Sequence, residues 1–194
     1  MSKRAEAYAR GGARAISVLT EEDHFQGSPE DLRAVAGSGL PRLRKDFLLD
    51  EAMVLESVSM GADAVLLMAC CLPGEQLREL REVARRAGLV VLLEIHDEAE
   101  LERALAVEPD CLGVNARDLR TFEVDLPKAL QLIRRVATME SHPLLVAESG
   151  ILGPEQLQQA ADAGADAVLI GESLMREEAP DRALAEWLEV LRDR

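Results

Sequence analysis

Short apolar runs alternate with amphipathic stretches along nearly the whole chain. Runs of strand length are followed by stretches in which apolar residues recur at helical spacing, a pattern typical of βαβ units and a parallel sheet. It predicts seven strands, at residues 15–20, 40–47, 61–68, 90–96, 111–115, 143–150 and 167–170. It predicts helices at 1–10, 50–60, 74–87, 97–107, 126–137, 154–163 and 180–192, another beginning at 28–31, and a short helical turn at 171–175.

A small turn motif is repeated before the predicted strands. Gly61-Ala-Asp-Ala-Val and Gly164-Ala-Asp-Ala-Val are near copies, and Gly12-Ala-Arg-Ala-Ile and Pro109-Asp-Cys-Leu are related to them. Glycine accepts a positive φ at the end of a helix, and the aspartate is expected to cap the turn. We interpret the motif as structural.

The alternation of strands and helices predicts one barrel-type α/β domain over residues 1–194. A closed parallel barrel of this class has eight strands, whereas seven are predicted, and none precedes the first helix. The sheet is therefore expected to have open edges at residues 15–19 and 167–170. Unpaired edges favour association with another chain, so a homodimer is one expectation.

Composition and charge narrow the class of protein. The chain has 194 residues, of which 48% are hydrophobic and 30% charged, and no apolar run reaches membrane-spanning length. Its first residues lack the apolar segment of a signal peptide, so a cytoplasmic, globular protein is expected. The net charge of −14 argues against nucleic acid and anionic membranes as partners, but not against a small anionic substrate in a locally positive cleft.

Three cysteines bear on metal and redox chemistry. Cys70, Cys71 and Cys111 are odd in number and lack the spacing of metal ligands. We expect all three to be buried thiols in a reducing compartment, and we expect no metal site.

Polar and charged residues gather where the predicted strands end. In parallel α/β barrels, ligands bind at the carboxyl ends of the strands. The apolar run that begins the strand at 90–96 ends in Glu94, a carboxylate that a buried strand does not need for packing. The other strand ends supply Lys45, Asn115 with Arg117, Glu148 with Ser149, and Gly171 with Glu172 and Ser173.

Each of these residues also has a purely structural interpretation. Glu94 fits an ion pair that closes a strand, Lys45 a solvated strand end, and Asn115 a turn. Arg117 fits a salt bridge to Asp118 or Glu94. Because they recur on successive strands, their joint placement favours a functional site.

The last two loops suggest a site for a phosphate group. Ser149-Gly150 follows one strand, and Gly171-Glu-Ser173 opens a short helix after the next. Glycines let main-chain N–H groups approach an anion, and a helix N-terminus is electropositive. The alternative is that Gly150 and Gly171 are only turn residues.

Taken together, these segments resemble the indole-3-glycerol phosphate synthase family of tryptophan biosynthesis. The similarity runs in the family's order along nearly the whole chain. It is carried by Ser17-Val-Leu-Thr20, Phe25-Gln-Gly-Ser28, Leu43-Arg-Lys-Asp-Phe47, Gly61-Ala-Asp-Ala-Val-Leu-Leu67, Leu93-Glu-Ile-His96, Gly113-Val-Asn-Ala-Arg-Asp-Leu119, Ala147-Glu-Ser-Gly-Ile151 and Leu169-Ile-Gly-Glu-Ser-Leu-Met175.

The resemblance implies a (βα)8 barrel of the ribulose-phosphate-binding group and a carboxy-lyase activity. The family closes an indole ring on 1-(2-carboxyphenylamino)-1-deoxyribulose 5-phosphate with loss of carbon dioxide and water, without cofactor or metal. The resemblance implies that Lys45 is the general acid and Glu94 the general base, an arrangement that needs neighbouring charges to separate their pKa values.

Further roles are implied in the same way. Asn115 and Arg117 match positions that hold substrate hydroxyls and support the catalytic carboxylate. Phe25 and Leu66 would contact the anthranilate ring, and Ser149 would lie near the substrate chain. The phosphate cradle would be formed by Gly150, Gly171, Glu172 and Ser173.

The sequence departs from the family pattern at its front. The family has an N-terminal extension and a first strand ending in glutamate and lysine, whereas this chain aligns with strands two to eight. One alternative is therefore a catalytically silent barrel that binds phosphate ligands or associates with another chain. Another is a different phosphate-binding barrel such as phosphoribosylanthranilate isomerase, which Lys45, Glu94 and Asn115 fit less well.

Overall fold

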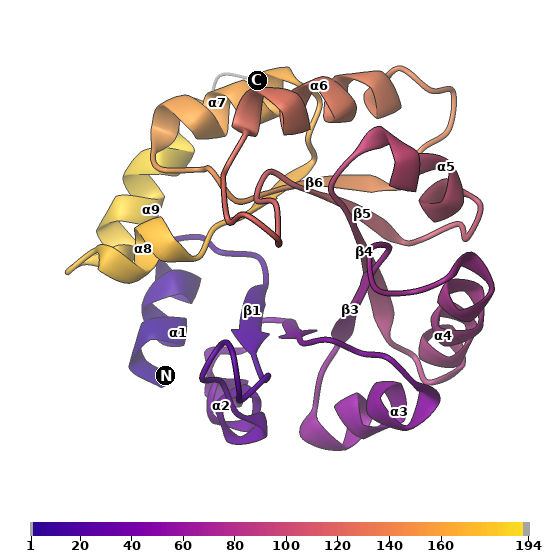
Figure 1. Cartoon of the computed structure of the whole chain (residues 1–194). Coiled ribbons are helices and arrows are strands. Elements are labelled where there is room, and N and C mark those ends of the chain that lie inside the picture. Colours follow the sequence, from indigo (N-terminus) through magenta and orange to yellow (C-terminus); the bar gives the residue numbers. More distant parts are fainter. Residues whose placement is uncertain (1, 192–194) are drawn as a thin grey trace.

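A curved sheet of seven parallel strands forms the centre of the molecule (Figure 1). The computed structural model describes residues 2–191. The strands pair in chain order, β1-β2-β3-β4-β5-β6-β7, with every pairing parallel. They are β1 (Ile16–Leu19), β2 (Arg42–Lys45), β3 (Ala64–Met68), β4 (Val90–Ile95), β5 (Cys111–Asn115), β6 (Leu144–Glu148) and β7 (Ala167–Leu169).

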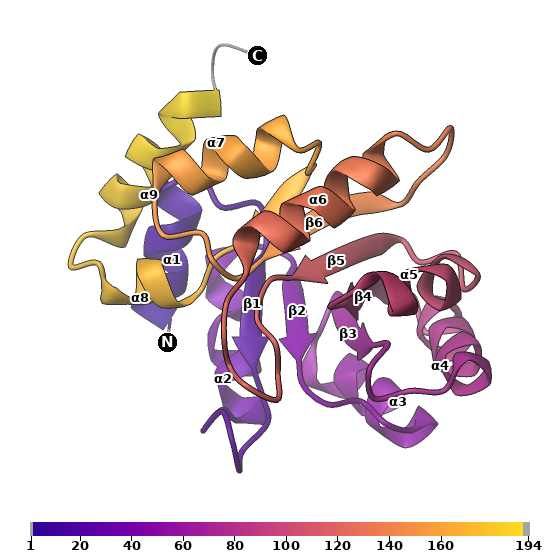
Figure 2. The ribbon, with the colours of Figure 1, turned by 45° about the horizontal axis from the view of Figure 1, so that its top comes forward.

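Helices surround the sheet on its outer side (Figure 2). They are α1 (Ser2–Arg10), α2 (Pro29–Ala34), α3 (Glu51–Met60), α4 (Gly74–Arg86), α5 (Glu98–Leu105), α6 (Leu126–Ala137), α7 (Pro154–Asp162), α8 (Glu172–Arg176) and α9 (Pro180–Leu188). Two 3₁₀ turns, Ala36–Ser38 and Glu189–Leu191, complete the described elements. Each predicted strand and helix is confirmed, mostly with ends a few residues shorter. The predicted residues Met1 and Arg192 lie outside the described range.

Two sequence expectations are wrong. Cys70 and Cys71 are exposed and Cys111 is only half-buried, although buried thiols were expected. Strand β3 ends at Met68, so Cys70 and Cys71 lie in the turn that follows it and not in the sheet.

The aspartates of the repeated turn do not cap their own turns, the second wrong expectation. Each accepts a hydrogen bond from a main-chain N–H near the start of the preceding strand: Asp63 from Arg42 at 2.8 Å, and Asp166 from Leu145 at 2.8 Å. Asp110 does the same for Val91 at 2.9 Å. The aspartates thus accept hydrogen bonds from main-chain N–H groups at the N-terminal ends of the strands, which agrees with a structural role for the motif.

Alternation along the strands separates two packed layers. Val65, Leu67, Val91 and Leu93 face the helices and are fully buried. The opposite face carries a second buried cluster inside the curved sheet, made of Leu43, Leu66, Met68, Leu92 and Val146. This inner cluster is the floor on which the polar strand ends lie.

The two ends of the chain meet in the helical layer. Helix α1 lies beside α8 and α9 in both views (Figures 1 and 2). The Arg4 guanidinium donates to the carbonyl oxygens of Leu174 and Glu177, and Arg10 pairs with Asp181 at 3.4 Å. Among the described residues, β1 and β7 do not pair with each other, so the two open sheet edges are confirmed.

Candidate active site

Four polar side chains converge at the carboxyl ends of the central strands. Parallel pairing places Asn115 opposite Glu148 and Glu94 opposite Gly113, all on the inward face. Lys45 ends β2 on the same face. Because successive strand residues point to opposite faces, the strand register places these groups above the inner apolar cluster.

Lys45 bridges two buried carboxylates. Its Nζ lies 3.0 Å from Oε2 of Glu94 and 3.3 Å from Oε2 of Glu148. The two glutamate side chains are 1% and 2% exposed, whereas that of Lys45 is 21% exposed. One ammonium thus faces two carboxyl groups that water hardly reaches.

The second carboxyl group explains why Gly113 is a glycine. A Cβ at this position would lie 2.0 Å from Oε1 of Glu148 and 3.3 Å from Leu92. That buried oxygen has no hydrogen-bond partner among the described residues. The absence of a side chain on β5 therefore makes room for the Glu148 carboxyl group.

The three groups titrate very differently. Burial disfavours the charge of Lys45, but the carboxylates of Glu148 and Glu94 outweigh it and raise its pKa to about 12. Burial opposes ionisation of Glu94 too, but the charge and hydrogen bond of Lys45, with a hydrogen bond from Asn115, lower its pKa. For Glu148, burial and the neighbouring Glu94 raise the pKa to about 8 despite Lys45. At neutral pH the site holds an ammonium, a carboxylate and a protonated carboxyl group.

Asn115 is held so that its amide can serve the carboxylate. Its Oδ1 accepts hydrogen bonds from the Ser149 hydroxyl at 2.8 Å and the Arg117 main-chain N–H at 3.0 Å. Its side chain is hydrogen-bonded to Glu94. Asn115 on β5 therefore links β4, through its hydrogen bond to Glu94, with the loop after β6, through its hydrogen bond from Ser149.

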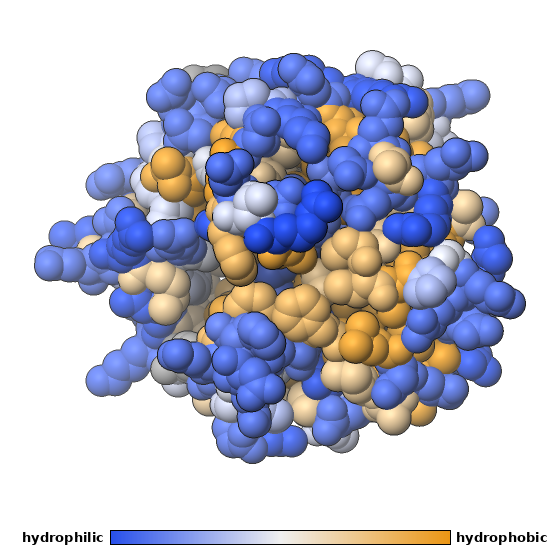
Figure 3. Space-filling view, in the orientation of Figure 1, coloured by the Kyte–Doolittle hydropathy of each residue, from blue (hydrophilic) through white to orange (hydrophobic). Residues whose placement is uncertain are grey.

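Two aromatic residues lie in the loops that follow β1 and β2. Phe25 stacks on Phe47 with ring centroids 5.6 Å apart and 38% of Phe25 exposed. Figure 3 shows a hollow near the centre of the face seen in Figure 1, with apolar side chains gathered around it and a hydrophilic periphery. Leu66, expected to contact a substrate ring, lies a layer deeper in the inner cluster at 2% exposure.

The two loops expected to hold a phosphate are tied together. The Ser173 hydroxyl donates to the carbonyl oxygen of Ile151 at 2.7 Å, which joins the loop after β7 to the loop after β6. Ser149 and Gly150 have positive φ of 63° and 74°. A Cβ on Gly171 would meet no described atom within 4 Å, so the main chain there is open to a ligand.

Arg117 pairs with neither of the acids anticipated from the sequence. Its guanidinium lies 3.3 Å from Glu172 and donates to the carbonyl oxygen of Phe122 at 3.2 Å. Glu172 also pairs with Arg176 at 2.5 Å. The Glu172 carboxylate is therefore engaged by two arginines.

Sequence reasoning left three neighbours of the site unassigned. Glu148 was noted at a strand end but given no role, although its position two residues after inward-facing Val146 placed it on the inner face. Phe47 lies two residues beyond Lys45. His96 lies two beyond Glu94, with Nε2 3.4 Å from Oε1 of Glu94.

Comparison with known proteins places the chain in a family. Residues 1–187 match the family model described as "Indole-3-glycerol phosphate synthase". A protein of that name from Acidovorax sp. (strain JS42) is 47% identical over 187 residues, which cover 94% of this chain and 69% of the relative. The synthase of Polaromonas naphthalenivorans (strain CJ2) is 47% identical over 183 residues, covering 94% and 68%.

A solved structure gives an independent view of the fold. The structure described as "Native KDPGal structure" superposes with a TM-score of 0.69 at 19% identity, covering all of this chain and 90% of the other. At that identity the likeness concerns the fold alone, and it agrees with the barrel-type architecture. From its family match and its relatives, this chain belongs to the indole-3-glycerol phosphate synthase family.

Proposed function

We propose that this chain catalyses the indole-3-glycerol phosphate synthase reaction. The substrate would be 1-(2-carboxyphenylamino)-1-deoxyribulose 5-phosphate, which loses carbon dioxide and water as the indole ring closes. The observation that carries the proposal is the group formed by Lys45, Glu94 and Glu148, in which one ammonium and two buried carboxyl groups hold different protonation states.

Each step has a candidate proton donor or acceptor. The ring carbon bearing the carboxylate attacks the substrate carbonyl carbon while Lys45 donates a proton to the carbonyl oxygen, and loss of carbon dioxide then restores the aromatic ring. The resulting hydroxyl leaves as water after a second protonation. Glu94 then removes a proton from carbon to complete the indole.

Glu148 supports the second protonation. Its carboxyl group is protonated at neutral pH and lies 3.3 Å from Lys45 Nζ. It can therefore return a proton to Lys45 after the first transfer. This makes Glu148 a third participant in the proposed proton transfers.

Binding residues surround this group. Asn115, with Ser149, orients Glu94 and faces substrate hydroxyls, and Phe25 contacts the anthranilate ring together with Phe47. Main-chain N–H groups at Gly150 and Gly171 take the phosphate. Ser173 holds their two loops together, Arg117 and Glu172 brace the rim, and Leu66 supports the floor.

A catalytically silent barrel is the second candidate. The observation that favours it is that the sheet has two open edges. Strand β7 is exposed or half-buried along its length, and β1 ends at the exposed Leu19. Such a chain would bind phosphate ligands or pair with a second copy through β1 or β7.

The test is the appearance of indole fluorescence when the purified chain meets the substrate. Glu94→Gln should lower turnover roughly 10²–10⁴-fold, the usual contribution of a positioned general base, while substrate binding measured by calorimetry changes little. Glu102→Gln is the matched control, because Glu102 is exposed on the neighbouring helix α5 and should leave turnover unchanged.

The remaining outcomes separate the two candidates. A folded chain that binds the substrate without turnover supports the silent barrel. Sedimentation would then show whether it pairs with a second copy, and a version extended at its N-terminus by one strand would show whether a paired edge restores turnover. Equal loss of binding and turnover in Glu94→Gln would make Glu94 a structural residue.

A further inference from the structure

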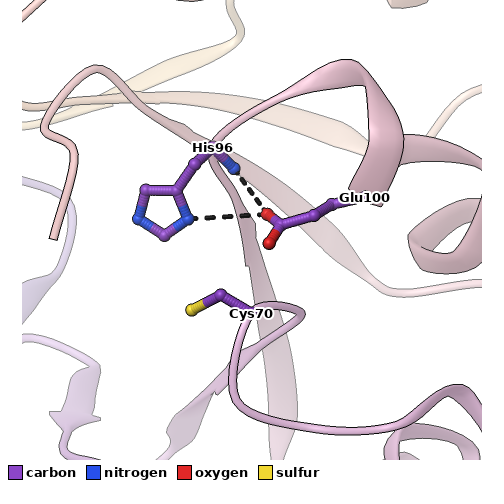
Figure 4. Close-up of side chains that lie close together, drawn as sticks. All are labelled: Cys70, His96 and Glu100. Atoms are coloured by element: carbon purple, nitrogen blue, oxygen red, sulfur yellow. Dashed lines mark hydrogen bonds and ion pairs between the residues drawn. The ribbon is translucent and has the colours of Figure 1, made fainter. Parts of the chain in front are cut away.

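A thiol, an imidazole and a carboxylate meet beside the proposed active site (Figure 4). Cys70 lies in the turn after β3, His96 directly follows β4, and Glu100 lies in the first turn of α5. One ligand atom from each can be chosen so that all three lie within 4.8 Å of one another. In Figure 4 the Cys70 sulfur and the Glu100 carboxylate both turn toward the His96 ring.

The histidine lacks good hydrogen-bond partners. Both ring nitrogens are buried and unpartnered by hydrogen bonds among the described residues. Nδ1 faces Oε2 of Glu100 at 3.5 Å, and Nε2 faces Oε1 of Glu94 at 3.4 Å. Buried polar atoms normally find a hydrogen-bond partner, so two such nitrogens on one ring require an explanation.

We propose that Cys70, His96 and Glu100 form a binding site for a thiophilic divalent cation, with Zn²⁺ as the best fit. Zn²⁺ takes sulfur, imidazole nitrogen and carboxylate oxygen as ligands, and sites with three protein ligands leave a fourth position for water. Bond lengths of about 2.0–2.3 Å place tetrahedral ligand atoms about 3.3–3.8 Å apart. The Nδ1 to Glu100 separation already has this value. The sulfur lies within 4.8 Å of its partner atoms, so it needs a shift of at most about 1 Å.

Two features hold the ligands in place. The Glu100 carboxylate accepts a hydrogen bond from the main-chain N–H of His96 at 2.8 Å, so it cannot swing away from the ring without losing that bond. Asp97 caps α5 by accepting from the Glu100 N–H at 3.2 Å. The imidazole and carboxylate are thus fixed relative to each other by the backbone.

The second ring nitrogen links this site to the proposed chemistry. Metal bound at Nδ1 leaves the proton on Nε2, which faces Glu94, the arrangement in which a carboxylate orients a metal-bound histidine. The ion would therefore lie one side chain away from the proposed general base. The proposal adds a site to the proposed function and does not depend on it, because the ligands lie outside the proton-transfer group.

The geometry also chooses between adjacent thiols. The Cys71 sulfur lies 3.6 Å from that of Cys70, but it does not belong to the three-residue cluster. Cys71 is therefore not a ligand in this proposal. Removing the Cys71 thiol is therefore a matched control for removing the Cys70 thiol.

Titration of the reduced chain with Zn²⁺ against a chromophoric chelator tests the site. We expect one Zn²⁺ ion per chain. Cys70→Ser and Glu100→Gln should each lower the affinity for Zn²⁺ at least about tenfold, because even residues that only hydrogen-bond to a metal ligand change metal affinity by about this factor. Cys71→Ser, Cys111→Ser and Glu102→Gln should bind like the parent chain. Circular dichroism of each variant checks that the fold is retained.

Cobalt gives a readout that is independent of affinity and of turnover. Co²⁺ bound at the site should show a thiolate-to-metal charge-transfer band that Cys70→Ser abolishes and Cys71→Ser retains. If the band survives in Cys70→Ser, or if parent chain and Glu100→Gln bind Zn²⁺ equally, the proposed ligand set is wrong.

Discussion

The two sides of the curved sheet differ in how completely their strands are buried. On the side formed by β3 to β6, the residues from the second position to the end of each strand are buried. On the other side, β7 has no buried residue and β1 has only one, Val18. The candidate site follows this division, since Lys45, Glu94, Asn115 and Glu148 lie between β2 and β6, where every strand has two neighbours.

The helical layer does not share this asymmetry. Helix α1 packs against α9, and a Cβ on Gly11 would lie 2.7 Å from the carbonyl oxygen of Asp181. The outer layer is therefore continuous where the inner sheet is interrupted. Helix packing and strand pairing are therefore separate features of this fold, and the charged group lies among strands that are paired on both sides.

The largest effect on stability is expected on the β1–β2 face that packs against the helices. Asp46 is hydrogen-bonded to Thr20 at 2.7 Å and to the buried Arg44 guanidinium at 3.0 Å. Asp46→Ala leaves Arg44 buried with only Glu56 as an ionic partner and should cost roughly 3–5 kcal/mol in urea unfolding. The exposed pair Arg33–Glu30 is the control, and Glu30→Ala should cost under about 1 kcal/mol. Similar costs for both would mean that burial of Arg44 is relieved by rearrangement.

Two leucine substitutions compare how much each side of the sheet contributes to stability. Leu92 is 6% exposed in the inner cluster, and Leu169 packs on the same cluster from the open side while half-buried. Leu92→Ala should cost roughly 2–5 kcal/mol, and Leu169→Ala clearly less, because less surface is withdrawn from water and the site can relax. Equal losses in denaturant unfolding would show that β7 is covered in solution, for instance by another chain.

Gly113→Ala tests the space that holds the second carboxyl group. The added methyl would lie 2.0 Å from Glu148 Oε1, so Glu148 must move. We expect a cost of roughly 1–3 kcal/mol together with a loss of turnover. Gly37→Ala is the control, since a Cβ there meets nothing within 4 Å. If Gly113→Ala leaves turnover unchanged, the position of Glu148 does not matter for the reaction.

A further prediction concerns the pH dependence of stability. The pKa of Glu148 is raised to about 8 in the folded chain, so the folded state keeps its proton while the unfolded state loses it above about 4.5. This contribution to stability is present at low pH and is lost as pH rises toward 8. Glu148→Gln mimics the neutral form and should remove the decline.

The pH range of the measurement separates the contribution of Glu148 to stability from that of His96. Burial disfavours the charge of His96, but Cys70, Glu100 and Glu94 raise its pKa to about 10, which gives a decline of the same sign above its unfolded value of about 6.5. Urea unfolding between pH 5 and 6.5 therefore reports mainly on Glu148. A slope that is the same in the parent chain and in Glu148→Gln would refute the raised pKa.

The lengths and hydropathies of the helices bear on whether any of them could span a membrane. In the part of the chain that the structure describes, no helix is both long and apolar enough to cross a bilayer. This agrees with the absence of a long apolar run in the sequence.

The order of elements and much of the candidate site could be predicted from the residues alone. Apolar runs located most of the seven strands, because a strand buried between two layers leaves a recognisable apolar run. The predicted strands end near Lys45, Glu94 and Asn115, and parallel strands place their carboxyl ends at one edge of the sheet. The resemblance to the family was readable for the same reason, since its motifs lie at those ends.

Which side chains meet depends on the folded arrangement of the strands. Nothing in the spacing of Lys45 and Glu148, 103 residues apart, fixes a 3.3 Å contact, and nothing local predicts that Gly113 makes room for it. The cluster of Cys70, His96 and Glu100 comes from the loops after β3 and β4 and the first turn of α5, so the cysteine spacing could not reveal it. Contacts between strands depend on register and side-chain direction, which the chain acquires only when the sheet is assembled.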